Sequence, residues 1–493
     1  MIDKMGKDVI NSRKIANASR WSACAEIMAK IVAPIVNVVL ARLLNPAIFG
    51  VVASITIITS FADIFTDAGF QRYIIQHEFN NDSELEKYTN IAFWSNFTLS
   101  ILIYAFIFLL RKKLAKLVGC PEVYQGIAIA ALAVICTSFS STTIARYRRS
   151  LEFKPLFFSR MISAFIPLVI TVPLAAILRS YWAMVIGTLS QQIFLAVFLI
   201  VKSDWKPKLY YSFTILKRMI SFSLWNLLES LSIWFAGQAN VFIVANTLNT
   251  YYLGLYKTAM STVNSYMAVI TASVTPVLFS ALSRYQNEKE LFDDTFHKFQ
   301  KIISIIVLPM GAGLLLYREF AVYILLGSQW LEISFFLGIW AFMSSLTITY
   351  SNVASEVYRS RGMPKISFFL QIIYMCLYIP AIIFSVKMGF TELCIVSTLI
   401  RFIPIIMDQI ALKHYFGISA FRILKNTIPS IVSALIMGCI AICLQNVADS
   451  LVWNIISILI CIFVYVTISL LFPSNRRVAQ MIPLIGKYIK RGE

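Results

Sequence analysis

The chain has 493 residues, of which 59% are hydrophobic and 14% charged, and its mean hydropathy is +0.76. A soluble domain is roughly half apolar and a quarter charged, so this composition excludes an ordinary soluble protein. The formal net charge of +19 would suggest nucleic-acid binding in a soluble chain. Here the basic residues lie between apolar segments, where loop lysines and arginines set membrane orientation. We therefore expect a lipid bilayer and no nucleic acid as a partner.

Stretches of about 20 apolar residues predict helices that cross the hydrocarbon core. Alternating polar and apolar ten-mers are absent, so membrane strands are not expected. The sequence predicts an all-α polytopic membrane protein with about fourteen transmembrane helices. The predicted spans are 21–43, 48–70, 90–110, 124–145, 157–178, 181–201, 219–246, 252–281, 299–317, 332–357, 366–386, 390–412, 427–445 and 452–472.

The loops show a charge asymmetry that predicts orientation. If the N-terminus is cytoplasmic, most of the 43 lysines and arginines fall in segments on the cytoplasmic side, and the basic loop 111–116 is the clear exception. This pattern indicates an even number of spans with both termini cytoplasmic. The basic, polar segment up to Arg20 predicts no cleavable signal peptide before the first span.

Two short motifs occur twice in the chain. Residues 44–50 and 248–254 both read Leu-Asn-x4-Gly, and each joins one predicted span to the next. Residues 147–150 read Tyr-Arg-Arg-Ser, and residues 358–360 read Tyr-Arg-Ser at the equivalent place after six further spans. Two halves related by an axis along the membrane normal are a recurring transporter plan.

The repeat predicts the domain organisation. We expect two pseudo-symmetric six-helix lobes, residues 1–201 and 202–413. Residues 414–493 then supply two additional transmembrane helices and a basic cytoplasmic tail.

Ionisable residues inside spans are costly, so they usually face a cavity or a partner. The predicted carboxylates of a cavity or coupling site are Glu26, Asp63, Asp67 and Glu229. The predicted substrate-binding residues are Lys30, Arg401, Lys257, Asn226 and Asn240. Lys30 and Asp63 lie at similar depth on neighbouring spans, which makes a pair between them plausible. A cavity of both signs suits a sugar head group with a pyrophosphate, because lysine and arginine hold phosphates.

A structural interpretation competes with this functional one. Charges inside spans can be buried, paired structural groups, or side chains that reach the interface from helix ends. The two interpretations are evenly balanced for four residues near predicted span ends, Asp67, Glu356, Arg160 and Asp408. Deeper positions, such as Lys30, Asp63, Glu229 and Arg401, favour function.

Enzyme chemistry finds little support in the sequence. The cysteines lie mostly in apolar runs without the spacing of a metal site or a disulfide framework, and we expect no cofactor and no metal. His77 and Asp82 form an H-x4-D pair, as in some acyltransferases, but no glycine-rich acceptor pattern accompanies it. A polysaccharide polymerase would carry a large outer loop, which is also absent. Loops of about twenty residues leave no room for a catalytic domain.

A resemblance to a known family begins at the first of the repeated motifs. Residues 40–50, Leu-Ala-Arg-Leu-Leu-Asn-Pro-Ala-Ile-Phe-Gly, resemble the LARLL-x-P-x-x-F-G segment of the polysaccharide transporter family. This is the Wzx-type branch of the multidrug/oligosaccharidyl-lipid/polysaccharide exporter superfamily, in particular its colanic acid and teichuronic acid exporters. The match continues through 62–70, 74–76, Asn90, Phe93, Trp94 and 148–154.

The resemblance implies a flippase and not an enzyme. Family members move undecaprenyl-pyrophosphate-linked oligosaccharides, the repeat units of O-antigen, capsule or exopolysaccharide, from the cytoplasmic to the outer leaflet of the bacterial inner membrane. It implies two six-helix lobes that rock around a central cavity, with polysaccharide polymerase and glycosyltransferases as further partners. Two transporter alternatives remain open, a lipid II flippase and a cation-coupled drug exporter of the same superfamily.

Overall fold

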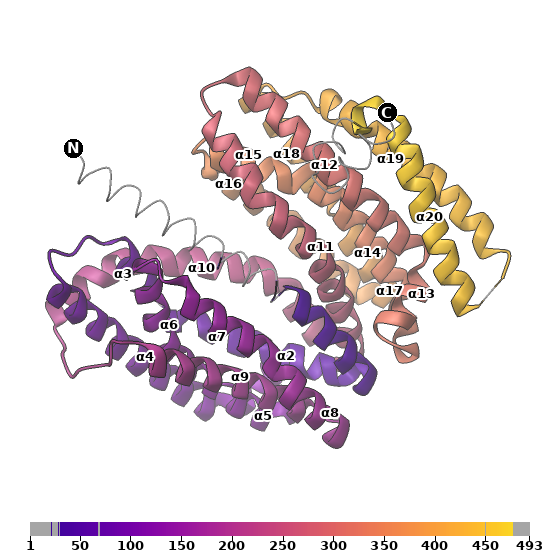
Figure 1. Ribbon diagram of the computed structural model, residues 1–493. Coiled ribbons are helices and arrows are strands. Elements are labelled where there is room, and N and C mark those ends of the chain that lie inside the picture. The colour runs from indigo at the N-terminus through magenta and orange to yellow at the C-terminus, as the bar shows by residue number, and fades with distance from the viewer. Residues whose placement is uncertain (1–20, 22–27, 29, 68–69, 449, 477–493) are drawn as a thin grey trace. The chain divides into compact units, whose positions relative to one another are not determined.

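The computed structural model describes residues 21, 28, 30–67, 70–448 and 450–476 (Figure 1). Throughout this part of the chain the regular elements are helices, and it contains no strand. The prediction of an all-α protein is therefore confirmed. The chain divides into two compact units, which we call the first unit (Met1–Lys257) and the second unit (Thr258–Glu493).

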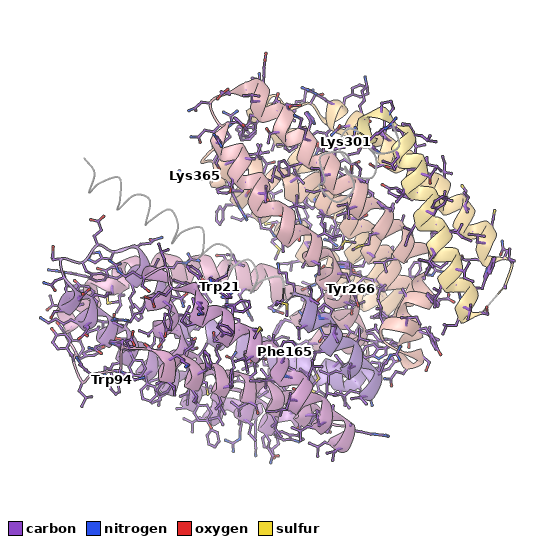
Figure 2. The ribbon with its side chains drawn as sticks, viewed as in Figure 1. Trp21, Trp94, Phe165, Tyr266, Lys301 and Lys365 are labelled. Carbon is purple, nitrogen blue, oxygen red and sulfur yellow. The ribbon has the colours of Figure 1, made fainter. Side chains whose placement is uncertain are left out.

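The first unit begins, in its described part, with helical residues that include 30–43. Trp21, labelled in Figure 2, packs against Phe157 at 4.9 Å between ring centroids. The elements that follow are α2 (Pro46–Asp67), α3 (Phe70–Gln76), α4 (Asp82–Leu117), η1 (Pro121–Val123), α5 (Tyr124–Ala130), α6 (Leu132–Arg149), α7 (Phe153–Ile166), η2 (Pro167–Thr171), α8 (Val172–Leu178), α9 (Tyr181–Lys202) and α10 (Phe213–Thr247). The next helix, α11 (Thr250–Arg284), runs from the first unit into the second.

The second unit continues with a similar series of helices. Its further elements are α12 (Lys289–Leu316), α13 (Arg318–Leu325), η3 (Ser328–Ile333), α14 (Ser334–Thr347), η4 (Ile348–Asn352), α15 (Val353–Ser360), α16 (Pro364–Met388), α17 (Phe390–Leu399), α18 (Phe402–Ala411), η5 (Leu412–Phe416), α19 (Ala420–Gln445) and α20 (Leu451–Leu471). Two of the short elements, η2 in the first unit and η4 in the second, are single π-helical turns inside longer helices, and η5 is a π-helical turn that ends the helix of α18.

The apolar helices agree with the predicted spans. Within the described residues eleven helices are long and apolar enough to cross a membrane, or twelve if the bent α11 counts as one span. The predicted stretch 219–246 is helical as part of α10, although α10 is not among these spans. Part of the stretch 21–43 lies outside the described residues. The chain is thus a multi-pass membrane protein, and the count of fourteen stays a prediction.

Helix α10 belongs to the first unit because of the helices it contacts. This helix packs against α2, α3 and α4, and the boundary between the units falls inside α11. The predicted lobes, 1–201 and 202–413, with 414–493 as an additional pair of helices, stay a prediction.

The first repeated motif forms the same helix start twice. The side-chain oxygen of Asn45 accepts a hydrogen bond from the backbone N–H of Ile48 (3.0 Å), and that of Asn249 accepts one from Tyr252 (3.0 Å). Asparagine is a strong N-cap, because its side chain satisfies a backbone donor that the first helical turn leaves open. The asparagine of the motif therefore starts α2 in one copy and α11 in the other.

The glycines of the two motif copies pack against each other. A Cβ atom added to Gly50 would lie 1.7 Å from the carbonyl oxygen of Thr250, and one added to Gly254 would lie 1.8 Å from that of Pro46. These contacts are reciprocal, because Pro46 and Thr250 occupy the same place in the motif. The two helices thus cross with their backbones in direct contact, which is possible only where a side chain is absent. We call this contact the glycine crossing.

The second repeated motif binds backbone carbonyls in both units. The hydroxyl of Tyr147 donates to the carbonyl of Lys202 at the end of α9 (2.8 Å). The hydroxyl of Tyr358 donates to the carbonyl of Asp408 in α18 (3.2 Å). Each tyrosine therefore ties its helix to a later helix of the same unit.

Arginines that follow these tyrosines also act alike. Arg149 donates to the carbonyls of Ile74 (2.8 Å), in the last turn of α3, and of His77 (2.6 Å), just after that helix. Its guanidinium lies 4.6 Å from the centroid of the Phe79 ring. In the second unit Arg361 donates to the carbonyl of Gln286, just after α11, and its guanidinium lies 4.2 Å from the centroid of the Phe292 ring. The two units thus also share contacts made by residues that are not identical in the two copies of the motif.

The last two helices are tied to the second unit along their whole length. α19 packs against α12 and α20, and the two final helices lie side by side (yellow in Figure 1). Their side chains donate to carbonyls of α12 near its start, middle and end. These hydrogen bonds are Asn426 to His297 (2.8 Å), Tyr465 to Ile305 (2.7 Å) and Gln445 to Leu316 (3.0 Å).

The glycine crossing generates a stability prediction. We expect Gly50→Ala and Gly254→Ala each to lower the free energy of unfolding by about 1–3 kcal/mol, because the added methyl overlaps a backbone carbonyl that cannot rotate away. Thermal unfolding of the purified protein in detergent measures the effect.

Gly237→Ala is the matched control, because nothing lies within 4 Å of a Cβ added there. Alanine is also the better helix former, by about 1 kcal/mol. An unchanged melting temperature in both crossing variants would show that the backbones do not touch.

Candidate functional site

Asp63 lies on α2 and faces α6 within the first unit. Its half-buried carboxylate accepts a hydrogen bond from the hydroxyl of Thr137 (3.2 Å). The ion pairs found among the described residues do not include one between Asp63 and Lys30. The structure therefore gives Asp63 a neutral partner, which leaves its negative charge uncompensated by a neighbouring base of the described chain.

One turn before Asp63, α2 contacts α10 through a polar and an aromatic interaction. The indole N–H of Trp234 donates to the Ser60 hydroxyl (3.0 Å), and its ring packs on Phe61 at 4.9 Å between centroids. Sequence reasoning did not select Trp234, because an aromatic residue in an apolar run carries no signal of a polar contact. The polar face of α2 is thus shared between α6 and α10.

Asn240 of α10 is buried and has local partners. It is 4% exposed, its side-chain N–H₂ lies 3.5 Å from the Tyr256 hydroxyl, and its side-chain oxygen accepts from the N–H of Val241 (2.9 Å). These contacts tie α10 to α11. A direct role in binding substrate would require these contacts to change.

Lys257 is differently placed. It is half-buried, and neither an ion pair nor a hydrogen bond of its ammonium group is found within the described chain. Residues three and seven apart share a helix face, so Lys257 lies on the face of α11 that carries Thr250 and Gly254. That face meets α2 at the glycine crossing. An ammonium group without a protein partner on this face can bind an anion.

Arg401 packs inside the second unit. It lies between α17 and α18, donates to the Ser344 hydroxyl (2.8 Å), and its guanidinium lies 4.3 Å from the centroid of the Trp340 ring. Both partners belong to α14, and Trp340 is 4% exposed. These contacts indicate that Arg401 holds α14 and α18 together, whether or not it also binds a ligand.

Several predicted site residues cannot be placed. Glu26 lies outside the described residues, and so do the side chains of Asp67, Asn226 and Glu229. Lys30 is described and half-buried. The roles assigned to these five residues stay predictions.

Two carboxylates near the ends of predicted spans have clear partners. Glu356 is 5% exposed and pairs with Arg359 at 3.1 Å. Asp408 is 8% exposed and accepts hydrogen bonds from the hydroxyls of Ser351 and Tyr358. The sequence named Asp408 but not its hydroxyl partners, since these lie some fifty residues away on another helix. A search of the described residues finds no group of three or more His, Cys, Asp or Glu that could hold a metal ion.

Sequence comparisons connect the chain to proteins named for polysaccharide biosynthesis. A family model described as "Polysaccharide biosynthesis protein" matches residues 39–335. An uncharacterized membrane protein in the cps region of Klebsiella pneumoniae is 24% identical over 76% of each chain. The lipopolysaccharide biosynthesis protein WzxC of Escherichia coli is 22% identical over 86% of this chain and 88% of its own. The succinoglycan biosynthesis transport protein ExoT of Rhizobium meliloti is 22% identical over 65% and 64%.

Structural comparisons give the fold. The lipid II flippase MurJ in an inward closed conformation aligns with a TM-score of 0.73 at 15% identity, over 91% of this chain and 97% of its own. An inward-facing multidrug transporter of the MATE family aligns with a TM-score of 0.54 at 14% identity, over 83% and 95%. The chain therefore has the fold of these transporters.

The contacts of Arg401 generate a second prediction. Arg401→Lys keeps the charge but loses the planar group that stacks on Trp340. We expect the free energy of unfolding to fall by about 0.5–2 kcal/mol, the range for a partly desolvated cation–π contact. Thermal unfolding checks this, with Arg284→Lys, an exposed position at the end of α11, as the control. Equal melting temperatures for Arg401→Lys and the control would contradict the packing role.

Proposed function

Because the chain belongs to the polysaccharide biosynthesis protein family, we propose that it is a flippase for undecaprenyl-pyrophosphate-linked oligosaccharide. The cargo is a repeat unit of O-antigen, capsule or exopolysaccharide, which moves from the cytoplasmic to the outer leaflet. The observation that carries this proposal is the family match over residues 39–335 in a chain with the fold of a lipid flippase.

The names of the relatives support this substrate class. WzxC acts in lipopolysaccharide biosynthesis and ExoT in succinoglycan transport, according to their names. The chain covers 88% of WzxC, so the likeness extends over nearly the whole of that protein. Both names refer to the biosynthesis of a sugar polymer, and ExoT's name adds transport.

The mechanism we propose is alternating access between two six-helix lobes. The polar sugar head passes through a hydrated cavity while the polyprenyl tail stays in lipid, and one side closes as the other opens. Membrane segments must satisfy their backbone groups internally, so rigid helical lobes are suited to such movement. The protein itself makes and breaks no covalent bond.

Lys257 is the residue we favour for holding the pyrophosphate. Its ammonium is half-buried, shares the face of α11 that meets α2, and has no described ion-pair partner. Phosphate oxygens are strong acceptors for such a group. Lys30 is a second candidate. Arg401 is a weaker one, because its guanidinium already contacts Ser344 and Trp340.

We further propose that the protein lies in the bacterial inner membrane with both termini cytoplasmic. The charge asymmetry of the loops supports this orientation. Glycosyltransferases that complete the oligosaccharide and a polymerase that consumes it are the partners that this reaction requires.

A lipid II flippase is the second candidate function. The structural alignment with MurJ, at a TM-score of 0.73, favours it over a drug exporter, for which the value is 0.54. Lipid II shares the polyprenyl pyrophosphate and differs in the sugar-peptide head. The two candidates are therefore separated by the substrate that accumulates when the protein is absent.

Loss of the gene tests the proposed function. We expect lipid-linked oligosaccharide to accumulate in the cytoplasmic leaflet, as measured by its accessibility to a membrane-impermeant reagent in oriented vesicles. Lys257→Ala should fail to restore its movement, because the variant loses the charge that holds the pyrophosphate, whereas Lys257→Arg should restore it at least in part.

Lys387→Ala is the control, since this lysine is exposed at the end of α16. Accumulation of lipid II alone would support the second candidate. Normal movement of both lipids together with increased drug sensitivity would instead indicate a drug exporter.

A further inference from the structure

Asp408 is a buried carboxyl group within a helical segment that is long and apolar enough to cross the membrane. It lies on α18, within the span Phe390–Phe416, and is 8% exposed. Burying an ionised carboxylate costs several kcal/mol, about what a charge in a membrane span costs, unless partners compensate for it. The partners of Asp408 therefore decide which protonation state the site can hold.

Both partners of the carboxylate are neutral hydroxyls. The hydroxyl of Ser351 donates to Oδ2, and that of Tyr358 donates to Oδ1 at 3.0 Å. Hydroxyls can donate to an ionised carboxylate and can also accept from a protonated one. The pair of hydroxyls can thus serve either state of Asp408, which a lysine or arginine could not do.

Charged groups nearby do not neutralise the carboxylate. The elements packed on α18 are α14, η4, α15, α16 and η5. α14 carries no charged residue, and Glu356 and Arg359 of α15 pair with each other at 3.1 Å. The ion pairs of the described residues do not include Asp408. The other charged or titratable side chains of these elements are Tyr350 of η4, Lys365, Tyr374, Cys376, Tyr378 and Lys387 of α16, and Lys413, His414 and Tyr415 of η5.

The tyrosine of the second motif joins two helices in each unit, but among the described residues only in the second unit does it also contact a carboxylate. In the first unit Tyr147 makes the corresponding contact with a backbone carbonyl alone, that of Lys202. In the second unit Tyr358 makes the carbonyl contact as well, to Asp408. The carboxylate is therefore an addition in one unit to a contact that works without it in the other.

The helix opposite Asp408 contains an irregular turn that can respond to a change of charge. Ser351 belongs to the π-helical turn η4, and such turns are frequent at functional sites. The side chain of Gln409 donates to the carbonyl of Tyr350 in this turn (2.8 Å), and the Tyr350 hydroxyl lies 2.8 Å from that of Thr427 on α19. A change at Asp408 would thus act on a connected polar network.

We propose that Asp408, held between the hydroxyls of Ser351 and Tyr358, is a proton-binding site that couples transport to a proton gradient. A proton from water binds a carboxylate oxygen, which changes the charge of the site from −1 to zero. The Ser351 hydroxyl then turns to accept a hydrogen bond from the new O–H. Release of the same proton to water restores the starting state. The coupling part of this inference rests on the proposed function, whereas proton binding does not.

Proton binding is tested on the purified full-length protein in lipid. Infrared difference spectra follow the C=O stretch of buried carboxylic acids as the pH is lowered. Asp408→Asn should lose one such band, while Asp204→Asn, at an exposed position, should keep it. Tyr358→Phe should move the midpoint of the band to higher pH, because the carboxylate loses a donor. A spectrum of Asp408→Asn identical to that of the unaltered protein would overturn the proposal.

Coupling is tested in proteoliposomes that contain lipid-linked oligosaccharide. A difference of one pH unit across the membrane should change the ratio of substrate between the leaflets by up to about tenfold if one proton is coupled. Asp408→Asn should abolish this dependence. An equal response of the variant would overturn coupling and leave the flippase intact. A substrate that does not move at all, with the Asp408 band present, would refute the flippase and leave the proton site standing.

Discussion

Water cannot satisfy backbone polar groups in the hydrocarbon core, and this constraint governs the whole molecule. At several helix ends and at one π-helical turn, a side chain donates to a carbonyl that regular hydrogen bonding leaves open. Tyr147 donates to a carbonyl at the end of α9, Arg149 to carbonyls at the end of α3, and Gln409 to a carbonyl of the turn η4. This requirement alone can explain these polar residues.

Residues that the requirement does not explain are the better candidates for function. Lys257 has a charge but no described ion-pair or hydrogen-bond partner, so it is suited to a ligand that arrives and leaves. Asp408 has two hydroxyl partners but no counter-charge, so it is suited to a proton. The two residues lie in different units, and the flippase we propose would need both kinds of site, one for its cargo and one for its energy.

The sequence predicts the helices well, because a run of about 20 apolar residues has only one stable form in a bilayer. It does not predict which partners those helices face. The cavity role of Arg401 stays a prediction, and its contact with Trp340, some sixty residues earlier in the chain, has no signal in the sequence. Depth follows from position along a span, whereas the facing partner depends on how distant helices pack. Asp408 shows the reverse case, since a position near a span end concealed an organised polar site.

The glycine crossing has the form of a symmetric dimer interface that lies within one chain. In such an interface the same patch of each partner contacts the patch of the other. Residue i of one partner therefore contacts residue j of the second, and residue j of the first contacts residue i of the second. Gly50 and Gly254 obey this rule with the carbonyls of Thr250 and Pro46. A side chain added to the glycine of either copy therefore meets a backbone carbonyl of the other copy. Each copy of the motif supplies both a glycine that leaves space and a carbonyl that fills the space of the other copy. This mutual fit accounts for the same motif on both sides of the contact, although the two stretches lie far apart in the sequence.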